Sequence, residues 1–236
     1  MPTSTHKEFV ASLKEIGRPS KVSDVSRFFR KDPESKSEDN KFLGVRIGSI
    51  FQVAKQFADM PLTDVDRLLD SAYYEVRMGA VSIMDFQARA KSTSAEKRKA
   101  LFDLYIRRHD RINNWDMVDR AAPYVVGGYL DDKPRDILYR LARSNNPCER
   151  RTAIVSTYYF IRQGDVEDTF RIAEILYKDN HDLVQKAVGS WIREAGKKDQ
   201  KRLVRFLERH GASMPRTMLR YAVEKLPPAL RTKFAG

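Results

Sequence analysis

Cysteine is almost absent from this chain of 236 residues. Cys148 is the only one, which excludes an internal disulfide and any zinc site built from several cysteines. Long apolar runs are also missing, because the longest, Ala121–Leu130, is only about half of the ~20 residues that cross a bilayer as a helix. The first residues lack the apolar stretch of a signal peptide, so we expect a cytoplasmic protein without membrane association.

Motifs of the common nucleotide and metal enzymes are missing as well. The four histidines are scattered without the spacing of metal ligands. No glycine-rich phosphate loop or dinucleotide fingerprint follows a strand, because alternating strand patterns are nearly absent. No nucleophile elbow is present either. We therefore expect no metal and no cofactor, and chemistry based on ATP, NAD or zinc is disfavoured.

Acidic residues are too few to balance the basic ones. The chain has 44 Lys and Arg against 32 Asp and Glu, which gives a net charge of +12. A surplus of this size favours a polyanionic partner, most often nucleic acid, although a basic protein without such a partner is the alternative. Apolar residues make up 42% of the chain, as in an ordinary folded protein with a buried core.

Helix signals dominate the sequence and predict an all-α fold. Thr93 with Glu96 fits a capping box, and Asn146 is followed by Pro147 and Glu149 in the order of a helix start. Apolar residues between such starts recur at spacings of three and four, as on one face of a helix. Glycines follow several of these patterns, where a left-handed residue would close a helix. They are Gly17, Gly164, Gly196 and Gly211.

One stretch interrupts the succession of helices. The segment 31–41 contains no apolar residue and is predicted to be an exposed, mobile loop. No other linker is long enough to separate domains, so we expect a single domain over residues 1–236.

Basic residues recur near the starts of the expected helices. Arg77, Arg151, Lys186 and Arg220 are separated by 74, 35 and 34 positions, and Asn114–Asp116 lies where a missing member of the series belongs. A period of this length with two helices per unit is typical of HEAT-like helical-repeat solenoids. A helical domain without repeats is the alternative.

The repeat has an electrostatic consequence. Equivalent helices of a solenoid stack side by side and line its concave face. Basic residues that recur at one helix position would therefore form a basic concave groove, suited to following a phosphate backbone. For each arginine taken alone, a solvated surface charge is the alternative.

One short segment combines an aromatic ring with acidic groups. Trp115 and Asp119 are four residues apart, so a helix places them on one face, one turn from each other. An indole and a carboxylate together attract a cation. The alternatives are a tryptophan that packs in the core and a solvated aspartate.

Over roughly residues 20–230 the chain resembles the DNA alkylation-repair glycosylases of the AlkD-like family. The matching segments, in order, are Phe42–Arg46, Trp115–Asp119, Arg151–Ile154 and Gln185–Gly189, followed by Arg193 and Glu194. The resemblance implies a monomeric HEAT-like solenoid that acts on double-stranded DNA containing alkylated bases. It also implies excision of cationic alkylated purines, such as 3-methyladenine and 7-methylguanine, without a metal. Such a protein would be nucleoid-associated when bound to DNA.

The resemblance also implies roles for individual residues. Trp115 matches a tryptophan that contacts the sugar, and Asp119 matches the catalytic carboxylate. Arg151 matches an arginine at the backbone of the lesion, and Phe28 lies where an aromatic DNA contact is expected. The further residues expected to bind DNA are Arg77, Arg150, Lys186 and Trp191.

One position departs from the family pattern. The family places a second active-site tryptophan directly after the glycine at position 189, whereas this chain has Ser190 there and Trp191 one step later. One step on a helix turns a side chain by about 100°, so Trp191 is free to pack in the core instead. A non-catalytic protein that recognises damaged or structured DNA is therefore the second interpretation. A helical-repeat scaffold for an acidic protein is the third.

Overall fold

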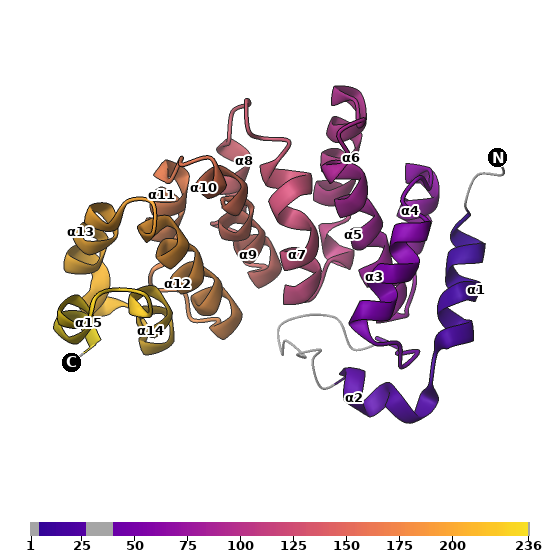
Figure 1. Ribbon diagram of the computed structural model, residues 1–236, viewed down its shortest axis with the longest axis horizontal. Helices are drawn as coiled ribbons and strands as arrows, with labels where there is room; N and C mark the ends of the chain where they lie inside the picture. The colour runs from indigo at the N-terminus through magenta and orange to yellow at the C-terminus, as the bar shows by residue number, and fades with distance from the viewer. Residues whose placement is uncertain (1–4, 27–39, 236) are drawn as a thin grey trace. The chain divides into compact units, whose positions relative to one another are not determined.

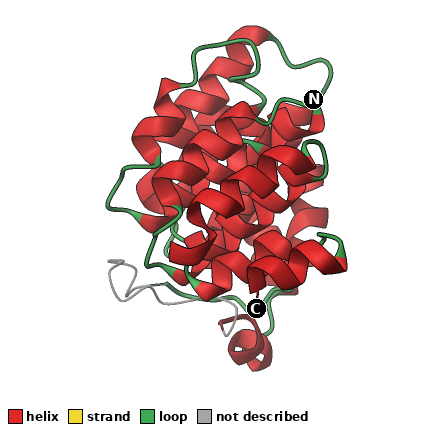
Figure 2. Ribbon diagram, turned by 90° about the vertical axis from the view of Figure 1, so that its left-hand side faces the viewer, coloured by secondary structure: helices red, strands yellow, loops and turns green. Residues whose placement is uncertain are grey.

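The computed structural model describes residues 5–26 and 40–235 of the chain (Figure 1). Within these ranges Figure 2 shows only helices and loops, and the one β-type pairing there is an isolated bridge between Lys41 and Tyr73. The prediction of an all-α fold is therefore confirmed. Most of the segment 31–41 lies outside the described residues, as does Phe28. No helix of the described ranges is both long and apolar enough to cross a membrane.

The helices form two compact units, Met1–Tyr129 and Leu130–Gly236. The α-helices of unit 1 are α1 (His6–Ile16), α2 (Val22–Ser26), α3 (Ile47–Gln56), α4 (Leu62–Leu69), α5 (Tyr74–Arg89), α6 (Ala95–Arg107) and α7 (Trp115–Ala121). Those of unit 2 are α8 (Asp136–Leu141), α9 (Pro147–Ser156), α10 (Tyr158–Arg162), α11 (Glu167–Leu176), α12 (Asp182–Gly196), α13 (Gln200–His210), α14 (Arg216–Val223) and α15 (Pro228–Ala235). Organisation as a single domain stays a prediction.

Helix α5 is the centre of unit 1. It packs between α3 and α7, and α4 and α6 also contact it (Figure 1). Almost all of its side chains are buried, including Glu75 and Arg77 near its start. Gly79 lets α1 approach closely, because a Cβ there would lie 2.2 Å from the Phe9 ring. Phe9 in turn meets Phe57 edge-on, with ring centroids 5.3 Å apart.

Unit 2 is built from helix pairs. Helix α12 packs against both α9 and α14, while α8 pairs with α9 and α11 pairs with α12. The contact between α12 and α14 is close at Gly189, where a Cβ would lie 2.4 Å from the carbonyl oxygen of Met218. This succession of helix pairs confirms the predicted helical-repeat fold. The basic concave groove stays a prediction.

The repeat is visible in hydrogen bonds at the starts of α5, α9 and α12. In each helix the side chain of the fourth residue donates a hydrogen bond to the backbone carbonyl oxygen six residues earlier. This bond connects the helix to its preceding loop. These bonds join Arg77 to Ser71 (2.7 Å), Arg150 to Ser144 (3.0 Å) and Gln185 to Asp179 (2.9 Å). The structural equivalent of Arg77 is therefore Arg150, and the predicted alignment of Arg77 with Arg151 is wrong by one residue.

Candidate functional site

The first two turns of α7 carry the aromatic and acidic residues singled out from the sequence. Trp115 is the first residue of this helix and Asp119 the fifth, so they lie one turn apart. Both side chains are partly exposed. The next residue after Trp115 is Asp116, a second carboxylate that the sequence analysis did not single out.

Asp116 is held by three hydrogen-bond donors. The hydroxyl of Tyr74 on α5 donates to its carboxylate, as do Asn114 Nδ2 (2.8 Å) and the backbone nitrogen of Met117 (2.9 Å). Burial raises the pKa of Asp116 to about 6, and the negative charge of Asp119 acts in the same direction, whereas the hydrogen bonds oppose the rise. The same surroundings raise the pKa of Tyr74, chiefly through burial.

A cavity of about 510 Å³ opens beside this helix start. Trp115, Asp116 and Tyr74 line one side of it. The rest of the lining comes from α2, from the segment that leads into α3 and from α3 itself, with the apolar side chains of Ile47 and Ile50. Asp119 does not belong to the described lining. The structure thus brings Trp115 together with Asp116 at the cavity, and Asp119 follows one turn along the helix.

The start of α5 organises both sides of this cavity. Glu75 is fully buried, and its carboxylate accepts hydrogen bonds from the backbone nitrogens of Leu43 (3.0 Å) and Gly44 (2.9 Å). Gly44 has φ +76°, a conformation that favours glycine, and a Cβ there would lie 2.1 Å from the carbonyl oxygen of Arg18. The matched segment Phe42–Arg46 therefore positions the lining of the cavity.

Arg77 has a structural role in unit 1. Its side chain is 1% exposed, and its guanidinium donates to Ser71, to Asn40 and to Asn113 Oδ1 (3.3 Å). Burial lowers the pKa of Arg77 to about 10, helped by the neighbouring charge of Arg111. In the structure the buried guanidinium connects the loops before α5 and α7, and a contact of Arg77 with DNA stays a prediction.

Arg150 makes a similar network in unit 2. Its guanidinium forms a two-pronged ion pair with Asp179, at 2.6 Å and 3.2 Å, and donates to the carbonyl oxygens of Ser144 and Asn145. The Asp179 side chain is only 5% exposed. A phosphate contact by Arg150 would require some of these bonds to break.

The next two basic positions are also engaged with protein groups. Arg151 is 8% exposed, and its guanidinium donates to the carbonyl oxygen of Leu183, which joins α9 to the start of α12. Lys186 is half-buried and bonds to Asp182 on the same helix at 3.0 Å. DNA contacts of Arg151 and Lys186 stay predictions.

Trp191 packs against another aromatic ring. Its centroid lies 4.9 Å from that of Tyr158 on α10, with an angle of 36° between the planes. Trp191 follows the buried residues Ala187 and Val188 by four and three positions, so it lies near the packed face of α12. Ser190 occupies the adjacent position.

Among the described residues, no three side chains of His, Cys, Asp or Glu gather in an arrangement that could hold a metal ion. The candidate site consists of the Trp115 indole and the carboxylates of Asp116 and Asp119.

The fold is shared with a solved structure described as a predicted DNA alkylation repair enzyme from Enterococcus faecalis. The TM-score is 0.68, and the match covers 90% of this chain and 97% of that chain. With 13% identity, this similarity concerns the fold alone. None of the curated proteins compared matches the chain in sequence.

The sequence of residues 9–226 matches the family described as DNA alkylation repair enzyme. The chain belongs to this family. It is accordingly a DNA repair enzyme directed at alkylation damage, with DNA as its substrate.

Proposed function

We propose that this protein is a monofunctional DNA glycosylase that excises cationic alkylated purines, such as 3-methyladenine and 7-methylguanine, from double-stranded DNA. The reaction is hydrolysis of the N-glycosidic bond in the first step of base excision repair. The observation that carries the proposal is the cluster of one indole and two carboxylates in the first two turns of α7, within a chain of net charge +12.

The chemistry follows from the charge of the substrate. Alkylation at purine N3 or N7 makes the base cationic and therefore a good leaving group. As the bond breaks, positive charge develops on the deoxyribose, and a fixed carboxylate near C1′ stabilises it and orients the attacking water. Asp119 takes this role, because it matches the catalytic carboxylate of the family and lies one helical turn from Trp115.

Trp115 supports the same step. Its indole lies against the sugar, excludes bulk water and presents a ring face that tolerates positive charge. The cavity beside Trp115 gives this side of the site room for a bound group.

The test is release of 3-methyladenine and 7-methylguanine from methylated duplex DNA under single-turnover conditions. Removal of one such electrostatic group costs about 10² to 10³ in rate, so Asp119→Asn is expected to slow excision by at least that factor. Affinity for DNA should stay nearly unchanged. Asp110→Asn is the matched control, because it removes an exposed carboxylate elsewhere in unit 1. Equal rates for Asp119→Asn and the wild type would remove Asp119 from the mechanism.

A non-catalytic DNA-binding protein is the second candidate. The contact of Trp191 with Tyr158 favours it, because the aromatic partner of Trp115 that the family pattern places after Gly189 is replaced here by Ser190. This candidate predicts binding to alkylated or structured DNA with no base released by the wild type.

A further inference from the structure

A second cavity, of about 590 Å³, lies between α14 and α15 in unit 2. Three arginines line it: Arg216 and Arg220 from α14, and Arg231 from α15. Thr217 adds a hydroxyl, and the remaining wall includes the apolar side chain of Val223. All three arginines are exposed.

Some arginines of unit 2, unlike those of this cavity, form ion pairs with carboxylates. Arg135 and Arg150, for example, are bonded to aspartates. In the described part of the chain, by contrast, no carboxylate forms an ion pair with any of the three cavity arginines. The one acid in the lining, Glu224, bonds to Arg193 and to Lys225 instead. The cavity therefore gathers positive charge that the described residues leave unbalanced.

The position of Arg220 links this cavity to the predicted DNA-binding residues. Arg220 is the fifth residue of α14, as Lys186 is of α12 and Arg151 of α9. Helix α12 packs against both α9 and α14. Arg151 is nearly buried and Lys186 is paired with Asp182, whereas Arg220 is exposed and forms no ion pair with the described residues. Its guanidinium lies over the Tyr221 ring, 5.7 Å from the centroid.

We propose that Arg216, Arg220 and Arg231 bind phosphate groups of the DNA backbone, as an anchoring site separate from the cluster on α7. Guanidinium groups bind phosphate through paired N–H donors, and such contacts position a protein on the duplex without reading its sequence. The inference rests on the proposed function for its choice of DNA as the ligand. A free phosphate ion offers the same chemistry, and the experiment separates the two sources.

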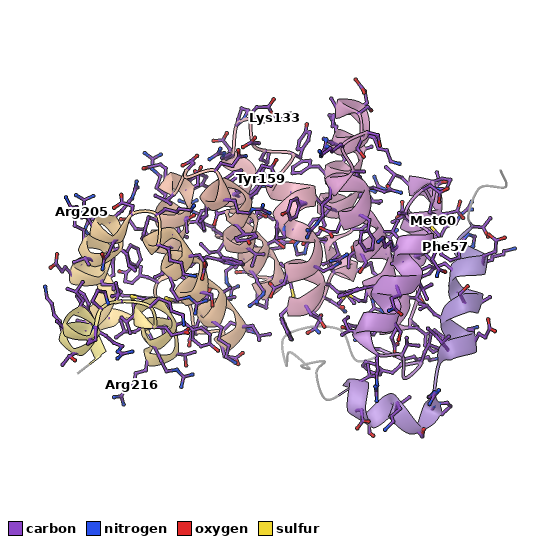
Figure 3. The ribbon with its side chains drawn as sticks, viewed as in Figure 1. Phe57, Met60, Lys133, Tyr159, Arg205 and Arg216 are labelled. Carbon is purple, nitrogen blue, oxygen red and sulfur yellow. The ribbon has the colours of Figure 1, made fainter. Side chains whose placement is uncertain are left out.

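The first arm measures binding to an undamaged duplex by fluorescence anisotropy at several KCl concentrations. Each of Arg216→Gln, Arg220→Gln and Arg231→Gln is expected to reduce the slope of log affinity against log salt by about one. The control is Arg205→Gln, which removes an exposed charge from α13 outside this cavity; Figure 3 shows Arg205 and Arg216 on opposite sides of unit 2. Slopes reduced no more than in Arg205→Gln would overturn the proposal.

The second arm measures the melting temperature in inorganic phosphate and in chloride of equal ionic strength. A phosphate-specific stabilisation lost in the Gln variants, together with unchanged DNA slopes, would assign the cavity to free phosphate and overturn the proposal. Neither arm uses base excision, so a protein that releases no base still tests the anchoring site.

Discussion

The substitution Asp116→Asn tests whether the partly buried carboxylate at the start of α7 makes stability depend on pH. Burial raises the pKa of Asp116 from 3.8 to about 6 in the folded protein. The folded state therefore binds this proton more tightly than the unfolded state does. A shift of about two units at ~1.4 kcal/mol each corresponds to about 3 kcal/mol of folding free energy.

The sign follows from the two pKa values. Above about pH 6 the carboxylate is charged in both states, and the full cost of burying that charge is present. As the pH falls from about 6 to about 4, the folded protein takes up the proton first, so this group makes the protein more stable. Asn cannot titrate, so the variant lacks this contribution.

The measurement is urea unfolding of wild type and Asp116→Asn between pH 4 and pH 7.5, with Asp110→Asn as the control for removal of an exposed carboxylate. We expect the free energy of unfolding of the wild type, minus that of Asp116→Asn, to fall by about 3 kcal/mol as the pH rises through this window. A difference that stays constant or rises with pH would refute the reasoning, because it would mean that Asp116 is not destabilised by burial.

Three further substitutions test the packing. Gly189→Ala places a Cβ 2.4 Å from the Met218 carbonyl oxygen and should lower the free energy of unfolding by about 1–3 kcal/mol in urea titrations, whereas Gly48→Ala, with no atom within 4 Å, should not. Arg150→Met leaves the Asp179 carboxylate buried without its ion pair and should lower the free energy of unfolding by about 3–5 kcal/mol. The double variant Arg150→Met/Asp179→Asn should recover part of this loss. Trp191→Phe keeps a ring against Tyr158, so both the melting temperature and the excision rate should be unchanged; slower excision at an unchanged melting temperature would show that Trp191 contacts the substrate.

The helices were predictable because their signals are local. Asn146 caps α9 as expected, with its side chain accepting from the backbone nitrogen of Cys148 at 2.9 Å. The predicted cap at Thr93 is wrong by one residue, since Ser94 caps α6 and accepts from the backbone nitrogen of Lys97. Both caps use side chains within three residues of the bond they make, so sequence alone comes close to the correct start.

The predicted helix-ending glycines show the limit of such local signals. Gly164 adopts a positive φ of 91°, as a helix-closing residue does. Gly17, Gly196 and Gly211 do not have positive φ. Gly196 is needed for packing instead, because a Cβ there would lie 2.3 Å from the Leu203 side chain. A glycine required by a neighbouring side chain looks the same in sequence as one required by a turn.

The roles of the charged residues were less predictable than the helices. Recurrence marked Arg77 and Arg151 as DNA contacts, yet both guanidinium groups are turned to carbonyl oxygens of the protein. The partner of Arg150 is Asp179, which is remote in sequence and recognisable only once α9 and α12 are packed. The role of Asp116 was not predictable for the same reason, because its donor Tyr74 belongs to another helix.

In α5, α9 and α12 the side chain of the fourth residue donates a hydrogen bond to the preceding loop. The fourth residue of α7 is Val118, whose side chain has no donor for such a bond. The start of α7 depends instead on α5, through the bonds from Tyr74 to Asp116 and from Arg77 to Asn113. The positions of the indole and the carboxylates of the candidate site therefore depend on side chains of α5. Damage to the first turn of α5 should therefore loosen this site before it loosens α7 as a whole.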